Sequence, residues 1–298
     1  MPTGVPIEIR SLTKSFRAVA AVSDLSFTVQ PGQVTGFLGP NGAGKTTTLR
    51  VLLGLVAANS GTATFGGTAY RDLKRPLASV GTALEAASFH PGRTAANHLA
   101  VYALAAGIER SRVAAVLDQV GLAEYGDRRV GGYSLGMRQR LGLAFALLGD
   151  PGVLVLDEPV NGLDPEGIRW MRGLLRSLAA EGRTVLVSSH LLTEVQQTVD
   201  EVVIISRGRL VYSGTLDDLE AGTTVAADAP DRAGLAAALS GAGLPVEQGS
   251  DGLIVGGATA AEVGAIALAA GVPLSKLTAR QEGLEDVFLE LVGEGDRS

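Results

Sequence analysis

The stretch "GPNGAGKT", Gly39–Thr46, follows an apolar run, Val34–Leu38, and precedes an amphipathic run that starts at Leu49. It fits the pattern G-x-x-x-x-G-K-[ST]. In such a loop the glycines let backbone N–H groups turn toward phosphate oxygens, and the following helix adds the positive end of its dipole. The order of strand, glycine-rich loop and helix is what this mechanism requires. The stretch therefore predicts a loop that binds the phosphates of a nucleoside triphosphate.

Within this loop the side chains predict different roles. Lys45 supplies a positive charge near the phosphates, and the Thr46 hydroxyl can ligate Mg²⁺. The sequence therefore predicts a nucleotide with Mg²⁺ as its ligands. We expect the nucleotide to contact Gly39, Asn41, Gly42, Ala43, Gly44, Lys45, Thr46 and Thr47.

A second motif is an apolar strand that ends in two carboxylates, Val153–Glu158. In nucleotide-hydrolysing enzymes with this loop, an acidic residue at this strand end holds Mg²⁺, usually through water, and Asp157 is the candidate. Glu158 is then placed to accept a proton from the attacking water. In isolation the pair could cap a surface helix, but together with the loop it indicates hydrolysis.

The apolar runs predict the fold of the first two thirds of the chain. Val153–Leu156, Thr184–Ser188 and Glu201–Ser206 are separated by helical patterns, which is typical of a parallel sheet covered on both faces. Shorter strands are expected at Ile7–Ile9, Ser26–Val29, Val34–Leu38 and Thr62–Phe65. Residues from about 91 to 140 have helical spacing and no strand candidate, so they predict a helical insertion in this α/β domain.

The composition changes after Glu220, where the chain becomes poor in Arg and rich in Ala and Gly. We therefore expect two domains, residues 1–221 and 222–298. The second shows the order βαββαβ, which is that of a small α+β ferredoxin-like domain. Its expected elements are a strand at Thr223–Ala227, a helix at Arg232–Leu239, a hairpin at Val246–Val255, a helix at Ala260–Ala269 and a strand at Leu274–Thr278. A last helix is expected from the apolar stripe Leu284, Val287, Phe288 and Leu291.

Charge and composition exclude several classes of protein. The chain has 25 Lys+Arg and 31 Asp+Glu residues. Residues 222–298 contain 4 of the basic and 11 of the acidic residues, a net charge of −7. Residues 1–221 contain the other 21 basic and 20 acidic residues, a net charge of +1. Neither part offers the basic field expected of a nucleic-acid-binding protein. There is no cysteine, hence no disulfide or thiolate chemistry. The longest apolar run, Leu99–Ile108, is about half of what a bilayer-spanning helix needs, so we expect no insertion into lipid.

The segment "YSLGMRQR", Tyr133–Arg140, resembles the signature Leu-Ser-Gly-Gly-Gln of the ATP-binding cassette (ABC) family. Ser134 and Gly136 match, whereas Tyr133, Leu135 and Met137 depart. Ser134 is positioned as an N-cap, so its hydroxyl and the N–H groups after it offer a second phosphate-binding surface.

Other motifs follow in the order that the family shows, over about residues 5 to 220. Asn161–Asp164 is similar to the D-loop, and His190, at the end of an apolar strand, is similar to the switch histidine. The resemblance implies that Glu158 and His190 are catalytic and that Ser134, Gly136 and Asp164 contact the nucleotide. It also implies that the nucleotide is ATP and that Phe16 stacks on its adenine.

Glu85 is an informative departure, because the resemblance predicts a glutamine there. Glutamine offers an oxygen and an N–H₂ donor, whereas a carboxylate offers oxygens only. We expect Glu85 to meet the metal, directly or through water, so the predicted metal set is Thr46, Asp157 and Glu85. The alternative is a solvated loop carboxylate.

The resemblance implies a P-loop NTPase fold of the ABC type and an ATPase subunit of an exporter, close to those of drug and antibiotic self-resistance. Two cassettes would meet head to tail, each ATP lying between the Lys45 loop of one chain and the Ser134 segment of a second copy or a homologous ATPase. ATP-driven dimerisation would power a separate integral-membrane permease from the cytoplasmic face of the cell membrane. Two alternatives stay open: a soluble remodelling ATPase acting on ribosomes or DNA, and a regulatory module with vestigial hydrolysis. The C-terminal domain would stabilise the dimer or sense a small ligand.

Overall fold

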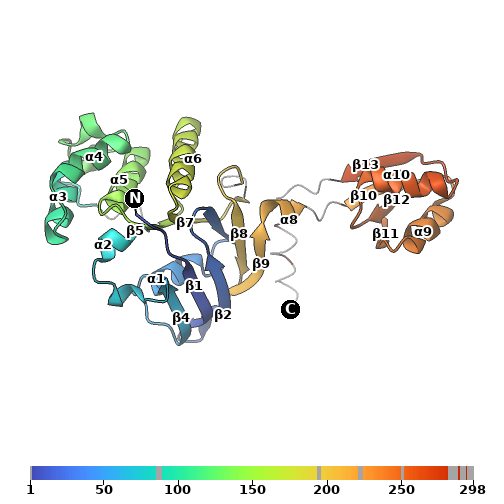
Figure 1. Ribbon diagram of the computed structural model, residues 1–298, viewed down its shortest axis with the longest axis horizontal. Helices are drawn as coiled ribbons and strands as arrows, with labels where there is room; N and C mark the ends of the chain where they lie inside the picture. Colours follow the sequence, from blue (N-terminus) through green and yellow to red (C-terminus); the bar gives the residue numbers. More distant parts are fainter. Residues whose placement is uncertain are drawn as a thin grey trace. The chain divides into compact units, whose positions relative to one another are not determined.

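The computed structural model describes residues 2–84, 89–192, 196–220, 224–249 and 252–280, together with residues 288 and 293. They form two compact units, one up to Ser213 and one from Gly214 onward. The strands of the first unit, the last of which runs two residues past this boundary, are β1 (Ile7–Phe16), β2 (Val19–Val29), β3 (Val34–Leu38), β4 (Ser60–Phe65), β5 (Val80–Ala83), β6 (Val153–Asp157), β7 (Thr184–Ser189), β8 (Glu201–Ser206) and β9 (Arg209–Thr215). The helices are α1 (Lys45–Leu52), α2 (Pro76–Ser79), α3 (Ala95–Ala105), α4 (Ser111–Gln119), α5 (Leu135–Leu147) and α6 (Pro165–Ala180), with short 3₁₀ turns at Tyr70–Asp72, Ala123–Tyr125 and Val130–Gly132 (Figure 1).

A six-stranded sheet in the order β5-β6-β7-β3-β8-β9 carries the site. The pairs β5 with β6, β6 with β7, β7 with β3, and β3 with β8 are parallel. Every residue of β3 and β7 is buried, which fits the mainly apolar composition of these strands in the sequence. The register aligns Leu38 with Ser189 and Asp157 with Ser188. The segments that follow β3, β6 and β7 therefore meet at one edge of the sheet.

A second sheet, antiparallel and in the order β2-β1-β4, packs on the first through a shared core. Helix α1 contacts β2, β4 and β6, and its buried Leu49 and Leu52 belong to that core. Phe27 on β2 and Phe37 on β3 approach to 5.1 Å between ring centroids. The helix that begins at the phosphate-binding loop is thereby fixed between both sheets.

Helices α3, α4 and α5 form the helical insertion expected from about residue 91, and they lie together to one side of the antiparallel sheet (Figure 1). Strands β5 and β9 were not anticipated from the sequence. Strand β5 has only four residues, Val-Gly-Thr-Ala, which show no clear alternation. Strands β1 and β2 are longer than expected because polar residues continue their pairing beyond the apolar ends.

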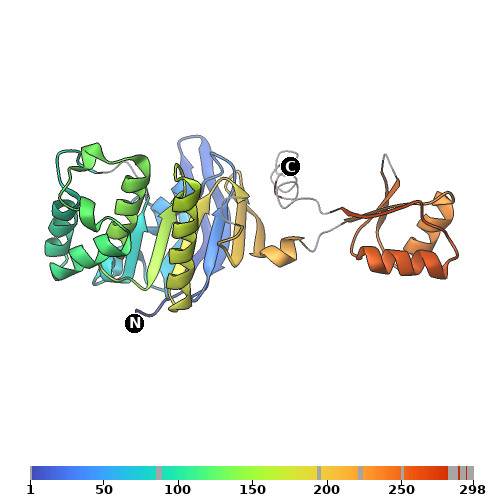
Figure 2. The ribbon, with the colours of Figure 1, turned by 90° about the horizontal axis from the view of Figure 1, so that it is seen from above.

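The second unit has α8 (Leu216–Glu220) followed by β10 (Thr224–Asp228), α9 (Arg232–Gly241), β11 (Val246–Gly249), β12 (Gly252–Val255), α10 (Ala260–Ala269) and β13 (Lys276–Arg280). The strands lie in the order β11-β12-β10-β13, and every neighbouring pair is antiparallel. Both helices cover one face of this sheet (Figure 2). Their contact with it buries Val225, Leu235, Leu253 and Val263. The expected last helix lies almost entirely outside the described residues, although Phe288 is helical and buried.

Candidate functional site

The glycine-rich loop lies between β3 and α1, and two of its glycines have backbone conformations that other residues rarely adopt. Gly42 and Gly44 have φ of 83° and 104°. A Cβ on Gly44 would lie 2.4 Å from the carbonyl oxygen of Ala21 on β2. Helix α1 begins at Lys45, and its N-cap residue is Gly44, which has no side chain to occupy the N–H groups of the first turn. These N–H groups and the dipole make the start of α1 a fitting anion site.

Lys45 is buried beneath this loop and directs its ammonium group to oxygen atoms. Its Nζ donates to the carbonyl oxygens of Gly39 at 2.6 Å and Pro40 at 3.3 Å. It also lies 3.9 Å from Oε1 of Glu158. Burial lowers the pKa of Lys45, while the carboxylates of Glu158 and Asp157 act in the opposite direction. An anion bound at the loop would compensate the desolvated charge.

Thr46 and Asp157 come together at the edge where β3 and β6 end. Thr46 Oγ1 lies 3.0 Å from Oδ2 of Asp157, and the other carboxylate oxygen, Oδ1, accepts a hydrogen bond from the hydroxyl of Ser188. Magnesium prefers hard oxygen ligands and is usually held by one or two protein groups together with phosphates. A hydroxyl and a carboxylate at this distance, beside the anion site, fit a Mg²⁺-nucleotide.

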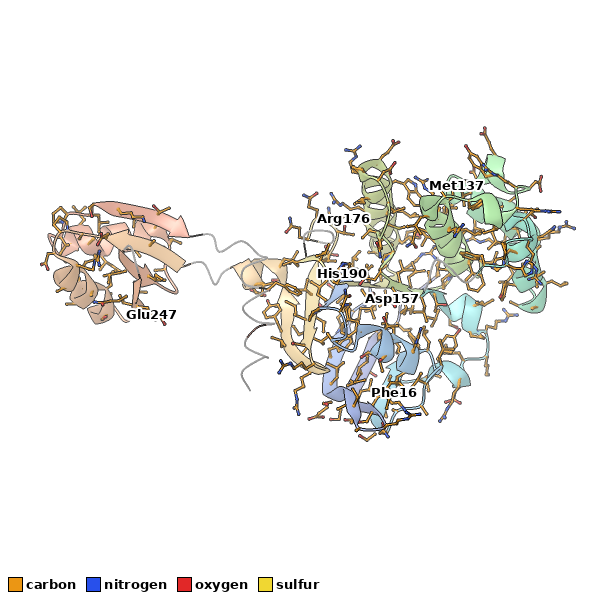
Figure 3. All side chains as sticks on the ribbon, turned by 180° about the vertical axis from the view of Figure 1, so that it is seen from behind. Phe16, Met137, Asp157, Arg176, His190 and Glu247 are labelled. Carbon is orange, nitrogen blue, oxygen red and sulfur yellow. The ribbon has the colours of Figure 1, made fainter. Side chains whose placement is uncertain are left out.

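Glu158 follows β6 in the left-handed conformation, with φ of 50°. Its carboxylate lies between two nitrogen groups, because Oε2 is 3.0 Å from His190 Nδ1 and Oε1 faces Lys45. His190 comes from the end of β7, so the neighbouring strands bring the two residues together. Figure 3 shows Asp157 and His190 near each other in the middle of the first unit. The Glu158 carboxylate is therefore placed to accept a proton from water, with the His190 imidazole beside it.

The signature segment lies at the start of α5. Ser134 is the N-cap, and its Oγ accepts from the Met137 N–H at 3.2 Å, as the sequence predicts. Ser134 and Leu135 are exposed. A Cβ on Gly162 would lie 2.1 Å from Leu135 Cδ2, so the two residues are in contact, and the φ of 74° at Gly162 favours glycine there. The signature segment and the loop after β6 are therefore in direct contact.

Several predicted residues lie apart from the cluster of Lys45, Thr46, Asp157 and Glu158. Asp164 is the N-cap of α6, where its Oδ1 accepts from the Gly167 N–H at 2.7 Å. Phe16 is 48% exposed at the end of β1, with the Lys14 ammonium 4.9 Å from its ring centroid. Figure 3 shows Phe16, and Met137 of the signature segment, away from Asp157 and His190.

Two other groups of predicted residues complete the account of the site. Asn41 and Gly42 are exposed in the loop, Ala43 is buried, and Thr47 is half-buried on α1. Glu85 lies outside the described residues, so its role as a metal ligand stays a prediction.

The sequence did not point to the residues that brace the loop and the carboxylates. Ala43 O accepts from the Gly208 N–H at 2.8 Å, and a Cβ on Gly208 would meet the Ala21 oxygen at 2.7 Å. Ser188 contacts Asp157 from β7. Gly208 lies in the turn between β8 and β9, and Ser188 lies on β7, so both are distant in the chain from the residues that they contact. Only the pairing of the strands identifies them.

Comparison with known proteins is consistent with this geometry. Residues 22–161 match the family described as "ABC transporter", and residues 223–285 match one described as a domain of unknown function. The chain is 44% identical over 217 residues to the bacitracin transport ATP-binding protein BcrA of Bacillus licheniformis, covering 72% of this chain and 71% of that protein. It is 36% identical over 297 residues to the Nod factor export ATP-binding protein I of Burkholderia orbicola, covering 97% of each.

The fold is also similar to that of a solved ABC transporter subunit. A solved structure described as the ATP-binding subunit of an ABC transporter superposes with a TM-score of 0.65 at 28% identity, over 72% of this chain and 91% of that one. Among the residues that the structure describes, no helix has both the length and the apolarity to cross a bilayer. The chain belongs to the ATP-binding subunits of ABC transporters, and it binds and hydrolyses ATP.

Proposed function

We propose that this chain is the ATPase of an export system and drives a separate membrane permease. The observation that carries the hydrolytic part is the position of the Glu158 carboxylate, between His190 and Lys45 and beside the Thr46–Asp157 pair. Export is supported by the relative named for Nod factor export, which matches over nearly its whole length. The relatives reported above are transport proteins, which favours a transporter over a soluble remodelling ATPase or a regulatory module.

In this proposal each part of the site has a separate task. The first-turn N–H groups of α1 and Lys45 would bind the phosphates, and Thr46 and Asp157 would hold Mg²⁺, which would supply positive charge to offset that of the transferred phosphoryl group. Glu158 orients the attacking water and accepts its proton at a carboxylate oxygen. His190, 3.0 Å from that carboxylate, reaches the γ-phosphate and stabilises the charge that develops there.

One chain supplies only part of the environment of each nucleotide. Ser134 and Leu135 are exposed at the start of α5, with the helix N-terminus behind them. We infer that this surface covers the nucleotide held by the Lys45 loop of a second copy or a homologous subunit. Gly136 and Asp164 would complete that contact, and Phe16 would stack on the adenine. Closure around ATP and reopening after hydrolysis would then move the permease.

The second unit is, we infer, a ferredoxin-like accessory domain within residues 222–298. Its support is the order β11-β12-β10-β13 with two helices on one face. It would either stabilise the dimer of ATPase domains, residues 1–221, or sense a small ligand. In an export system the ATPase would work at the cytoplasmic face of the membrane, attached to its permease.

The test is to purify tagged Glu158→Gln from its native cell in membranes solubilised with ATP, since this variant should hold nucleotide without hydrolysing it. Lys45→Ala is the matched control, because Lys45 is the residue of the same site that we propose binds the phosphates. A polytopic membrane protein that copurifies in about equal amount with Glu158→Gln supports the proposal. Recovery of both variants from the soluble fraction with ribosomes or DNA would overturn it.

A further inference from the structure

Ser188 is a fully buried residue near the end of β7. The parallel register pairs it with Asp157 at the end of β6. Because successive residues of a strand alternate between the faces of the sheet, residues paired in register point to the same face. The hydroxyl of Ser188 is therefore placed beside the carboxylate of Asp157 by the strand pairing itself.

This hydroxyl contacts both acidic residues of the site. Ser188 Oγ donates to Asp157 Oδ1, since an ionised carboxylate can only accept. The same oxygen accepts from the backbone N–H of Glu158 at 3.0 Å, and the carbonyl oxygen of Ser188 accepts from that N–H at 3.2 Å. One side chain thus joins the carboxylate of Asp157 to the backbone of Glu158.

The contacts determine how Asp157 presents its second oxygen. With Oδ1 engaged by Ser188, Oδ2 lies toward the loop, 3.0 Å from the Thr46 hydroxyl. A freely rotating carboxylate would not keep this orientation. Ser188 therefore fixes the orientation in which the Asp157 carboxylate presents an oxygen toward Thr46 and the metal position.

The backbone of Glu158 is held at the same point. Its φ of 50° lies in a region that residues with a side chain rarely occupy, so surrounding bonds must hold it. The N–H of Glu158 donates to Ser188, and its carbonyl oxygen accepts from the Asn161 N–H at 3.2 Å. These two bonds fix the direction in which the Glu158 carboxylate leaves the chain.

We propose that Ser188 is a positioning residue for ATP hydrolysis, which directs Asp157 toward the metal and Glu158 toward the reacting water. The proposal rests on the function proposed above, in which Asp157 holds Mg²⁺ and Glu158 accepts the proton. Ser188 itself touches neither the nucleotide nor the metal. Its effect is therefore expected in metal binding and turnover, and not in the affinity for nucleotide without metal.

The experiment uses full-length Ser188→Ala and measures Mn²⁺ binding by electron paramagnetic resonance with a non-hydrolysable ATP analogue. Removing a group that orients a metal ligand typically weakens metal binding by about 10- to 100-fold, and we expect a loss of this size in Mn²⁺ affinity and in kcat. Affinity for the analogue in EDTA should be unchanged. Ser188→Thr, which keeps the hydroxyl, should restore Mn²⁺ binding.

Thr35→Val is the matched control. Thr35 is fully buried on β3 of the same sheet, and its hydroxyl has no hydrogen-bond partner among the described residues. Ser188→Ala with wild-type Mn²⁺ affinity would overturn the proposal, as would an equal loss of Mn²⁺ affinity in Thr35→Val.

If Ser188→Ala does not fold, Ser188→Cys takes its place in each measurement, because cysteine is of similar size and is only a weak hydrogen-bond donor. Wild-type protein without metal-dependent hydrolysis would contradict the proposed function, while Mn²⁺ binding would still test Ser188.

Discussion

Nδ1 of His190 lies 3.0 Å from Oε2 of Glu158, and the two residues come from the ends of neighbouring parallel strands. The contact links the imidazole of His190 to the carboxylate that faces Lys45 of the phosphate-binding loop. It also orients the imidazole, because one ring nitrogen is engaged and the other is directed away from Glu158. Glu158 is therefore the residue of this contact whose substitution tests the hydrolytic mechanism most directly.

We therefore predict that Glu158→Gln lowers the rate of ATP hydrolysis by about 10²- to 10⁴-fold, the usual contribution of a general base, and leaves ATP binding intact. The amide has the same shape but cannot accept the proton. Phosphate release and equilibrium nucleotide binding measure the two effects separately. Glu166→Gln, at an exposed position in the first turn of α6, is the control and should hydrolyse ATP normally. Near-normal turnover in Glu158→Gln would remove Glu158 from the mechanism.

A second prediction concerns Arg140 on α5 and Trp170 on α6, the single tryptophan of the chain. The guanidinium lies 4.1 Å from the ring centroid, and Nη1 donates to the carbonyl oxygen of Val120 at 3.1 Å. Arg140→Met removes both contacts and should lower the free energy of unfolding by about 1–3 kcal/mol. It should also change the fluorescence of Trp170.

Chemical denaturation followed by tryptophan emission measures both quantities. Arg138→Met, two residues earlier on the same helix, is the control for loss of an arginine from α5. Equal stability and identical emission in the two variants would show that Arg140 does not hold α5 against α6.

A third prediction concerns His98, a buried residue of α3 whose ring packs against Phe89, Tyr102 and Phe145. Its Nδ1 is buried and has no hydrogen-bond partner in the described part of the chain. Burial lowers the pKa of His98, and the charge of Arg93 lowers it further. Protonation therefore favours the unfolded chain, in which the pKa has its ordinary value of 6.5.

The stability that neutral His98 contributes is fully present above that value and is lost as the pH falls toward the lower pKa of the folded state. Melting temperatures measured between about pH 7 and pH 5 should fall more steeply for wild type than for His98→Phe. His90→Gln, at an exposed position, should follow the wild type. Parallel curves for wild type and His98→Phe would contradict this expectation.

A fourth prediction concerns the second unit. Thr259 and Glu262 form a reciprocal cap on α10, in which Thr259 Oγ1 accepts from the Glu262 N–H at 3.3 Å and Glu262 Oε2 accepts from the Thr259 N–H at 2.8 Å. Thr259→Ala should destabilise this unit by about 1 kcal/mol, the usual effect of removing such a cap. ATP hydrolysis by the first unit should be unaffected by this local loss.

Calorimetry of the full chain, with and without ATP, separates the transitions, because ATP stabilises the unit that binds it. Thr259→Ser keeps the hydroxyl and should melt like wild type. A shift of the ATP-sensitive transition in Thr259→Ala would show that the two units unfold together.

The sequence predicted the elements whose signals are local. The pattern of Gly39–Thr46, the apolar runs of β3, β7 and β8, and the helix Ala260–Ala269 each contain the information for their own structure, and all lie where they were expected. Strand β5 was not predicted, because four residues with a glycine show neither a helical nor an alternating pattern. Ser188 could not be found in this way, since its role depends on the register between β6 and β7.

The contact between Leu135 and Gly162 restricts how related sequences can diverge. In the signature that Tyr133–Arg140 resembles, the position of Leu135 is a glycine, which leaves space over residue 162. With leucine there, a Cβ at position 162 would lie 2.1 Å from its side chain. Because Leu135 is half-exposed and its Cδ2 is the far end of a flexible side chain, a residue larger than glycine at 162 would require this leucine to rotate, and the φ of 74° at Gly162 would strain any side chain there. Related sequences that lose this glycine are therefore expected to combine a strained backbone at 162 with a displaced or smaller side chain at 135.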